Sequence, residues 1–338
     1  MMSISVGIIG AGLIGRKRAM ALPKFDNCKL KVVVDVDRKR AEELAAEFGT
    51  ESETDWGKVV RRKDIDVIIV ATYNKYLMPI SVAALNNKKH VLCEKPLGRN
   101  IGESKQIIDA AKQSDVILKT GFNHRHHPAI AKAKELFTGG KIGKLYFLRC
   151  CYGHGGRPGY DKEWRADKDL CGGGELLDQG VHVVDLFRWL AGDFDEAFGY
   201  TETYFWNMEV EDNAFAIFKK DNGVVATMHT SWTQWKNRFS FEVYGSEGYL
   251  IVDGLGGGYG TETLRIGKRK PEGGPPYEEI MEFRGPDISW GEEWKEFISA
   301  IKEGREPLGN GWDGYQANRM IQAVYESAKT GKVIRLED

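Results

Sequence analysis

The sequence lacks the features that mark disulfide-rich, secreted and membrane-spanning proteins. Its five cysteines are odd in number and show no C-x-x-C spacing, which favours reduced thiols over a disulfide framework. No apolar run approaches the length that crosses a membrane. The segment Met1 to Ile4 has neither the charged nor the apolar region of a signal peptide. We therefore expect a cytoplasmic protein.

An excess of charge of either sign is also absent. The 48 Lys and Arg residues nearly balance the 49 Asp and Glu residues, so the net charge is -1. Neither nucleic acid nor a membrane surface is expected as a partner. Three histidines cluster at His124, His126 and His127, but no carboxylate or thiolate ligands can be placed beside them, so we expect no metal. With 338 residues, the chain is long enough for about two domains.

A glycine motif stands near the start of the chain. The apolar run Ile4 to Ile9 leads into Gly10-Ala11-Gly12-Leu13-Ile14-Gly15, the strand, turn and helix start that a G-x-G-x-x-G needs before it indicates dinucleotide binding. A second apolar run ends in Asp35, twenty residues after Gly15, where the acid that binds a ribose is expected. A carboxylate there favours NAD over NADP, although Arg38 offers positive charge close by.

Residues 1–122 alternate between strand-like and helix-like segments. This pattern predicts an α/β domain with a Rossmann doubly wound parallel sheet. Its strands are expected at 4–9, 30–35, 65–71, 90–93 and 116–120, and its helices at 14–22, 38–48, 77–87 and 101–114. The carboxyl ends of the strands then collect Gly10, Asp35, Thr72 and Glu94 on the edge where ligands bind such sheets.

The pattern changes in residues 123–338, which predict a second domain of α+β type. Most of its strands are separated by short turn signals, so we expect an open, mostly antiparallel sheet with helices on one face. The other face needs a cover, and apolar residues of these strands are candidates for a homodimer or homotetramer interface: Phe215, Ile217, Trp232, Phe239, Phe241 and Tyr244. The glycine-rich loop 254–260 is expected to be mobile.

Chemistry in the second domain centres on the predicted helix 175–190. At 100° per residue, Glu175, Asp178, His182 and Asp185 share one stripe, with Asp178 and His182 one turn apart. An ordinary amphipathic helix with its wet face outward would give the same periodicity. However, the stripe contains no Lys or Arg, and a histidine beside a carboxylate is a workable proton acceptor.

Two further segments are candidates for substrate contacts. Lys95 follows a strand end beside the predicted cofactor edge, where an ammonium group can stabilise a developing alkoxide or carbonyl; a surface lysine is the plain alternative. The loop 153–174 carries Trp164, which offers a stacking face, and Arg165, which offers a fork for carboxylate or phosphate. A solvated connecting loop would have the same composition.

Five motifs are spread over the chain: Gly10 to Gly15, Glu94-Lys95-Pro96, Gly121-Phe122-Asn123-His124-Arg125, Gly172 through Asp185, and the ending Tyr325 to Lys332. On these motifs the whole chain resembles the Gfo/Idh/MocA oxidoreductases, which include glucose-fructose oxidoreductase and inositol dehydrogenases. The resemblance has consequences for the site. It implies that Lys95 contacts the reacting hydroxyl, that a cis peptide precedes Pro96, and that Asp178 and His182 form an acid–base pair. It also implies that Asn123 and Arg125 line the cleft between domains.

One segment departs from the family pattern. Where the family commonly has Thr-Pro-Asn-x-x-His, this chain has Thr72-Tyr73-Asn74-Lys75-Tyr76-Leu77, which puts local cofactor and substrate contacts in doubt. The expected cofactor residues are Gly10, Gly12, Leu13, Ile14, Gly15, Asp35, Arg38, Thr72, Asn74, Glu94, Lys95 and Asn123. The expected substrate residues are Lys95, Arg125, Trp164, Arg165, Asp178 and His182, with Lys95, Asp178 and His182 catalytic.

The expected reaction is hydride transfer between NAD and a secondary hydroxyl of a sugar, cyclitol or sugar derivative. Two alternatives stay open. The first is redox-neutral glycoside cleavage with retained NAD, which would release sugar without net NADH. The second is a regulator that senses a dinucleotide without turnover, although such a protein has less reason to keep Lys95, Asp178 and His182 together.

Overall fold

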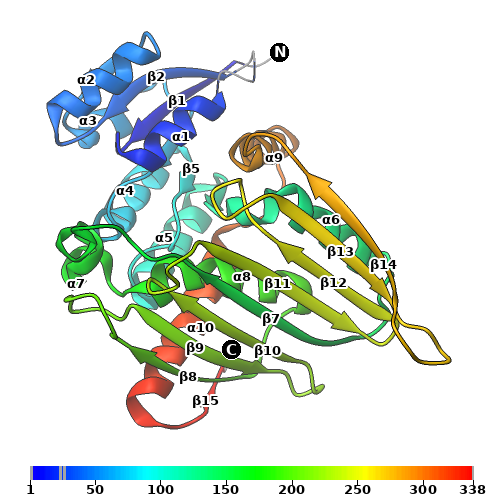
Figure 1. Cartoon of the computed structure of the whole chain (residues 1–338). Helices are drawn as coiled ribbons and strands as arrows, with labels where there is room; N and C mark the ends of the chain where they lie inside the picture. The colour runs from blue at the N-terminus through cyan, green and yellow to red at the C-terminus, as the bar shows by residue number, and fades with distance from the viewer. Residues whose placement is uncertain (1–2, 23–24, 26–27, 337–338) are drawn as a thin grey trace. The chain divides into compact units, whose positions relative to one another are not determined.

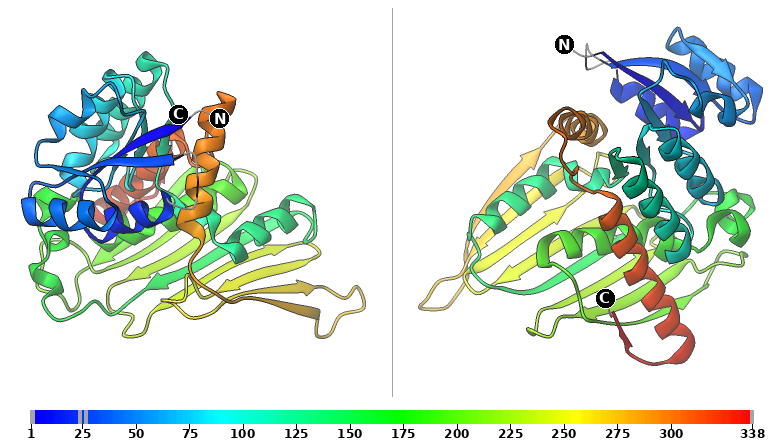
Figure 2. Two further views of the ribbon diagram at one scale, coloured as in Figure 1. Left: turned by 90° about the horizontal axis from the view of Figure 1, so that it is seen from above. Right: turned by 180° about the vertical axis from the view of Figure 1, so that it is seen from behind.

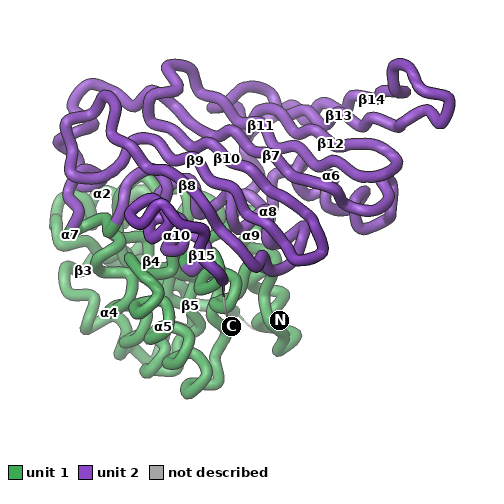
Figure 3. Tube along the Cα trace, turned by 90° about the horizontal axis from the view of Figure 1, so that it is seen from below, with its two compact units in different colours: residues 1–122, 169–172, 290–318 green, residues 123–168, 173–289, 319–338 purple. Residues whose placement is uncertain are grey.

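The structure, a computed structural model, describes residues 3–22, 25 and 28–336 and forms two compact units. Unit 1 comprises residues 1–122, 169–172 and 290–318, and unit 2 comprises 123–168, 173–289 and 319–338 (Figure 3). The chain first passes from unit 1 to unit 2 after Phe122, and it returns to unit 1 at residues 169–172 and 290–318. The expected domains, 1–122 and 123–338, are each one continuous segment.

Unit 1 contains a six-stranded sheet in the order β3-β2-β1-β4-β5-β6, and every adjacent pair of strands is parallel. This is the doubly wound order in which the strand sequence reverses beside β1, the point where dinucleotides bind. The strands are β1 (Ile4–Ile9), β2 (Cys28–Val34), β3 (Glu51–Glu53), β4 (Val67–Val70), β5 (His90–Cys93) and β6 (Leu118–Thr120). The predicted Rossmann sheet is confirmed.

Helices cover both faces of this sheet. Neighbouring residues of one strand, such as Ile8 and Ile9 or Ile68 and Ile69, belong to two different hydrophobic clusters, because successive side chains point to opposite faces of the sheet. The helices of unit 1 include α1 (Leu13–Ala21), α2 (Arg38–Glu47), α3 (Trp56–Val60), α4 (Asn74–Asn86), α5 (Ile101–Ser114) and, apart from Ser289, α9 (Ser289–Glu303). Neither β3 nor α3 was predicted.

Unit 2 is built on a nine-stranded sheet in the order β14-β13-β12-β11-β7-β10-β9-β8-β15. Only the pair β7 and β10 is parallel, so the expected mostly antiparallel sheet is confirmed. Its strands are β7 (Leu145–Gly153), β8 (Glu196–Glu202), β9 (Asn213–Lys219), β10 (Val225–Ser231), β11 (Arg238–Gly245), β12 (Gly248–Asp253), β13 (Glu262–Lys268), β14 (Tyr277–Phe283) and β15 (Ile334–Arg335).

Two helices cover one face of this sheet, as Figures 1 and 2 show: α6 (Pro128–Thr138) and α8 (Val181–Ala191). Helix α7 (Lys168–Cys171) is a single turn, and α10 (Gly311–Thr330) begins in unit 1 and ends in unit 2. Short 3-10 turns lie at Asn123–His126, Tyr160–Lys162 and Trp164–Ala166. Within the described ranges, no helix is long and apolar enough to cross a membrane.

The register of the sheet corrects part of the predicted interface. Trp232, Phe239 and Phe241 are at most 2% exposed, so they belong to the core of unit 2 and not to its outer face. Phe241, for example, packs 5.8 Å from the ring of Phe187 on α8. In contrast, Phe215 and Ile217 are 37% and 47% exposed, because the two-residue period of β9 turns them away from the helices.

Candidate active site in two half-sites

The glycine loop after β1 has the geometry of a dinucleotide-binding turn. Gly10 has a φ of +108°, and a Cβ there would lie 2.2 Å from the carbonyl oxygen of Ala71. A Cβ on Gly15 would lie 1.8 Å from the Gly10 oxygen, so helix α1 packs directly on the strand. A Cβ on Gly12 would meet nothing within 4 Å, which leaves open space against the backbone where a phosphate can approach.

The first turn of α1 is suited to hold an anion. Its N-cap residue is Gly12, which has no side chain to cap the helix, and its first turn contains no acidic residue. In contrast, α2 is capped by the carboxylate of Asp37. The partial positive charge of the α1 N-terminus is therefore not neutralised from within the helix. Leu13, the first residue of α1, is 71% exposed beside this site.

Asp35 supports the same loop from the end of β2. Its Oδ2 accepts a hydrogen bond from the backbone N–H of Ala11 at 2.8 Å, and its Oδ1 accepts one from Asp37 at 2.9 Å. Each carboxylate oxygen keeps a second lone pair for a further donor. Arg38 begins α2 with a 76% exposed side chain, 3.9 Å from Glu42. The residues present therefore fit an adenosine dinucleotide whose ribose hydroxyls donate to Asp35.

The remaining predicted residues of unit 1 lie at the ends of β4 and β5. The hydroxyl of Thr72 donates to the carbonyl of Tyr73 at 3.3 Å. Asn74 is buried and donates to the carbonyl of Cys171 at 2.8 Å. Lys95 is half-buried, and the peptide bond between Lys95 and Pro96 is cis, as the family resemblance implies.

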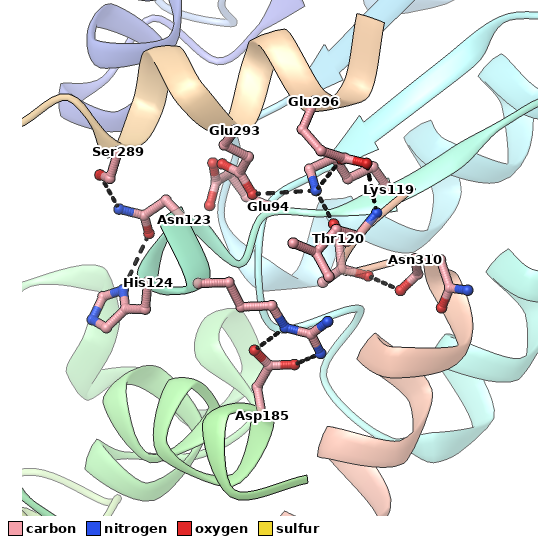
Figure 4. A network of polar contacts seen from close by, with 12 residues as sticks. Glu94, Lys119, Thr120, Asn123, His124, Asp185, Ser289, Glu293, Glu296 and Asn310 are labelled. Atoms are coloured by element: carbon pink, nitrogen blue, oxygen red, sulfur yellow. Dashed lines mark hydrogen bonds and ion pairs between the residues drawn. The ribbon is translucent and has the colours of Figure 1, made fainter. Parts of the chain in front are cut away.

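Glu94 belongs to a network of buried charges (Figure 4). Its carboxylate accepts a hydrogen bond from Nε of Arg18 at 2.7 Å, and the same guanidinium pairs with Glu293. Lys119 lies 3.9 Å from Glu293 and 3.4 Å from Glu296. Burial raises the pKa of Glu94, an effect that Arg18 opposes. The network joins α1, β5 and β6 to α9, so Glu94 also has a structural role.

In unit 2, the predicted helix 175–190 begins irregularly. Residues Leu176–Gly180 form a π-helical turn before α8 starts at Val181, so the assumed 100° per residue does not hold around Asp178. Glu211 accepts hydrogen bonds from the N–H groups of Gly174 at 3.1 Å and Leu176 at 3.0 Å, and from the hydroxyl of Tyr325 at 2.7 Å. This carboxylate satisfies backbone donors at the start of the helix. Burial raises its pKa.

The polar stripe of this helix is buried, so the alternative of a wet face turned outward is wrong. Glu175, His182 and Asp185 are 0%, 4% and 1% exposed. Asp185 accepts two hydrogen bonds from Arg125, at 2.8 Å from Nε and 2.5 Å from Nη2. The predicted substrate residue Arg125 thus holds α8 to the turn after residue 122 through a bidentate ion pair.

Asp178 receives a hydrogen bond from Nε of Arg165 at 3.0 Å. Burial opposes the charge of Arg165, but Asp178 and neighbouring anionic groups outweigh it, so the pKa of Arg165 is raised. The guanidinium also lies 4.6 Å from the ring of Trp164. One predicted substrate residue, Arg165, therefore pairs with the predicted catalytic residue Asp178 and lies against the other, Trp164.

His182 packs face to face on His124, a contact that the sequence analysis did not anticipate. The ring centroids are 3.6 Å apart and the planes differ by 16°. Tyr152 and Asn123 each lie 3.2 Å from a ring nitrogen of His124. The family-like segment 121–125 marks this region in the sequence, but the stacking partner comes from a helix more than fifty residues later.

Two other expectations concern loops and metals. Loop 254–260 is anchored: the hydroxyl of Tyr259 accepts a hydrogen bond from Gln179 at 3.0 Å, and Gly256 donates to Glu262 at 2.9 Å. His127 binds the same Glu262 through Nδ1 at 2.6 Å. Among the residues that the structure describes, no three His, Cys, Asp or Glu side chains are placed to hold a metal ion.

Comparison with known proteins accounts for both units. Residues 4–122 match the family model described as oxidoreductase family, NAD-binding Rossmann fold, and residues 130–251 match the GFO/IDH/MocA C-terminal domain.

Individual relatives match over nearly the whole chain. A levoglucosan dehydrogenase of Pseudarthrobacter phenanthrenivorans is 29% identical over 97% of both chains. A myo-inositol 2-dehydrogenase of Thermotoga maritima is 28% identical over 98% of both. A solved levoglucosan dehydrogenase in complex with NADH and L-sorbose has a TM-score of 0.91 and 26% identity over the full length of both chains. The chain belongs to the Gfo/Idh/MocA family of oxidoreductases, and its first unit is an NAD-binding Rossmann domain.

Proposed function

We propose that this protein is an NAD-dependent dehydrogenase that acts on a secondary hydroxyl of a sugar, cyclitol or sugar derivative. The observation that carries the proposal is the buried polar stripe of unit 2, in which His182 is 4% exposed and Asp178 is paired with Arg165. Burying such groups costs free energy unless they are paired, and buried titratable groups of this kind cluster at functional sites. The relatives named as levoglucosan and inositol dehydrogenases support the substrate class.

Unit 1 supplies the residues that would hold NAD. The N-terminus of α1 and the open side of Gly12 would bind the pyrophosphate, and Asp35 would accept hydrogen bonds from ribose hydroxyls. A carboxylate at this place repels a 2′-phosphate, which favours NAD over NADP. When bound, the nicotinamide accepts or donates the hydride.

Each catalytic side chain has a separate task. His182 accepts the proton of the substrate hydroxyl on a ring nitrogen, and the negative charge of Asp178 stabilises the imidazolium that results. Arg165 donates a hydrogen bond to Asp178 and fixes its orientation. Lys95 donates a hydrogen bond to the oxygen at the reacting carbon and stabilises its developing charge. Trp164 offers a stacking face for the sugar ring.

The proposal is tested by a screen of inositols, aldoses, uronates and anhydrosugars, followed by NADH absorbance in both directions. With the substrate so found, His182→Ala and Lys95→Ala are each expected to lower kcat/KM by about 10²-fold to 10⁴-fold, because each removes a positioned proton acceptor or donor. An unchanged circular dichroism spectrum shows that the variants are folded.

The control for both variants is Lys105→Ala, which removes an exposed lysine paired with Asp109 on α5 and should leave turnover unchanged. Full turnover in folded His182→Ala or Lys95→Ala would refute the assignments. Sugar release without net NADH would indicate redox-neutral glycoside cleavage instead. NAD binding without turnover across the panel would indicate a regulator.

We also infer that two or four copies associate through the outer face of the unit 2 sheet. Phe215 and Ile217 are exposed there, and Phe147 stacks on Tyr244 at 4.6 Å on the same face. An apolar surface of this kind favours a partner surface. Ile217→Asp should shift the mass measured by light scattering towards that of the monomer. Lys105→Ala should leave the mass unchanged, and an unchanged mass in Ile217→Asp would contradict this interface.

A further inference from the structure

The chain of polar contacts behind His124 fixes where its proton lies (Figure 4). The hydroxyl of Ser289 donates to Oδ1 of Asp287 at 2.6 Å, so its lone pairs must accept from the side-chain amide of Asn123, 3.0 Å away. The amide nitrogen of Asn123 therefore faces Ser289, and its oxygen faces Nδ1 of His124 at 3.2 Å. An amide oxygen can only accept, so Nδ1 of His124 carries a hydrogen.

The other ring nitrogen of His124 faces a phenol. Nε2 lies 3.2 Å from the hydroxyl of Tyr152, whose pKa burial raises well above its ordinary value. Tyr152 therefore keeps its proton and can donate it to Nε2, and it also forms a hydrogen bond with Tyr259. A neutral imidazole with Nδ1 protonated satisfies both the Asn123 and the Tyr152 contact of His124.

Neighbouring rings enclose the His124 ring and restrict its orientation. It is 6% exposed, its edge meets the ring of Phe239 at 6.2 Å, and the ring of His127 lies 5.5 Å away. His127 is itself bound to Glu262. The flat face of His124 that meets His182 is thus set by β7, β11 and the 3-10 turn Asn123–His126, none of which belongs to the helix that carries His182.

We propose that His124 is a positioning residue for His182: a neutral imidazole, locked by Asn123 and Tyr152, against which the proton-accepting ring is stacked. This inference rests on the proposed function, in which His182 accepts the hydroxyl proton. The stack at 3.6 Å fixes the plane of His182. Its neutral face also attracts the cation that His182 becomes, whereas a second imidazolium at this distance would repel it.

Two substitutions distinguish the effect of the flat His124 ring from the effect of its hydrogen bonds. His124→Phe keeps a flat ring for stacking, whereas His124→Ala removes it. We expect kcat to fall by about 10²-fold in His124→Ala, the loss typical of a misplaced catalytic group, and by at most about tenfold in His124→Phe. KM for the sugar and the affinity for NADH should stay within about twofold, because neither is bound by His124 in this proposal. A residue that only fills space would lower stability and cofactor affinity together with kcat, whereas loss of positioning lowers kcat alone.

A second measurement does not depend on turnover. Nitrogen-15 NMR of the histidine-labelled full chain, which has seven histidines, reports which ring nitrogen of each is protonated. His124 should be the Nδ1–H form at neutral pH, and Tyr152→Phe should change its signals. The matched control is His229→Ala, which removes a histidine stacked on Phe215 at 4.2 Å on another part of the sheet and should leave kcat unchanged.

Several results would overturn the proposal: an Nε2–H form of His124, equal loss of kcat in His124→Phe and His124→Ala, no loss in either, or a rise in KM at constant kcat. If His124→Ala does not fold, His124→Phe and the NMR measurement still decide. Failure of the proposed function gives a different outcome, because full turnover in His182→Ala refutes that function whatever form His124 takes.

Discussion

At the scale of single residues, Asp35 combines two tasks that are separable by experiment. It holds the glycine loop through the N–H of Ala11, and it places a negative charge at the end of β2. The first task supports any dinucleotide, whereas the second discriminates against a 2′-phosphate. The ratio of the two cofactor affinities therefore isolates the effect of the charge from the effect on the loop.

We expect Asp35→Asn to weaken NAD binding and to lower the preference for NAD over NADP by about tenfold, which corresponds to about 1.4 kcal/mol. The reason is that the amide does not repel a phosphate. Fluorescence titration with both reduced cofactors measures the ratio. Glu43→Gln removes an exposed acid of α2 and should leave the ratio unchanged. An unaltered ratio in Asp35→Asn would show that this carboxylate does not select the cofactor.

Other residues show where prediction from sequence stops. Gly10, Gly15 and Asp35 occupy the predicted places because a strand, a tight turn and a helix are local features. Asn74 and Glu94 were predicted only as cofactor contacts, yet they also bind Cys171 and Arg18, 97 and 76 residues away in the chain. No local pattern reveals a partner at such distances, because the tertiary fold selects it.

At the scale of elements, the start of the α8 region depends on Glu211. Its carboxylate receives two backbone N–H groups and the Tyr325 hydroxyl, and burial nevertheless raises its pKa. A raised pKa means that the folded state binds this proton more tightly than the unfolded chain does. The contribution of the proton to stability is thus complete below the unfolded pKa of about 4.3 and is lost as the pH rises through the folded value.

Glu211→Gln replaces this titrating group by a neutral one that cannot lose a proton. The parent protein loses this contribution as the pH rises, and Glu211→Gln does not. We therefore expect the free energy of unfolding of Glu211→Gln to increase relative to that of the parent, so that the variant gains relative stability, as the pH rises from about 4.3 towards neutrality. Urea denaturation at a series of pH values measures this difference, in which other titrating groups cancel. Glu326→Gln, on α10, should show no such trend. A parallel pair of curves for parent and Glu211→Gln would contradict the direction of the shift.

The predicted elements agree with the structure where their signals are strong and local. Alternating apolar segments located the main strands of unit 1, but β3 was missed because Glu51–Glu53 contains no apolar residue. The π-helical turn Leu176–Gly180 was missed because the periodicity of a sequence does not reveal one extra residue in a helical turn. Three residues of the predicted stripe, Glu175, His182 and Asp185, are buried, whereas the pairing of Asp178 with His182 stays a prediction.

At the scale of the whole molecule, the return of residues 290–318 to unit 1 is the feature that the sequence did not reveal. Trp294, Phe297 and Ile298 of α9 belong to the same hydrophobic cluster as strands β1 and β2. Glu293 of this helix pairs with Arg18, 275 residues earlier in the chain. The sequence pattern of α9 predicts a helix, but it does not indicate which surface the helix covers. Helix α9 completes the Rossmann domain although it lies far along the chain from the other elements of that domain.

We therefore expect Phe297→Ala, which empties a fully buried site, to lower the free energy of unfolding by about 3 to 5 kcal/mol. Trp312→Ala, at a 46% exposed position of α10 in unit 1, should cost much less. Because NAD would bind the folded form of the same unit, NAD at a hundred times its Kd should restore about 2.7 kcal/mol to either variant. Urea denaturation followed by circular dichroism, with and without NAD, measures both effects. If Phe297→Ala is no less stable than Trp312→Ala, α9 does not complete the nucleotide-binding core, and residues 1–122 would then be expected to fold without it.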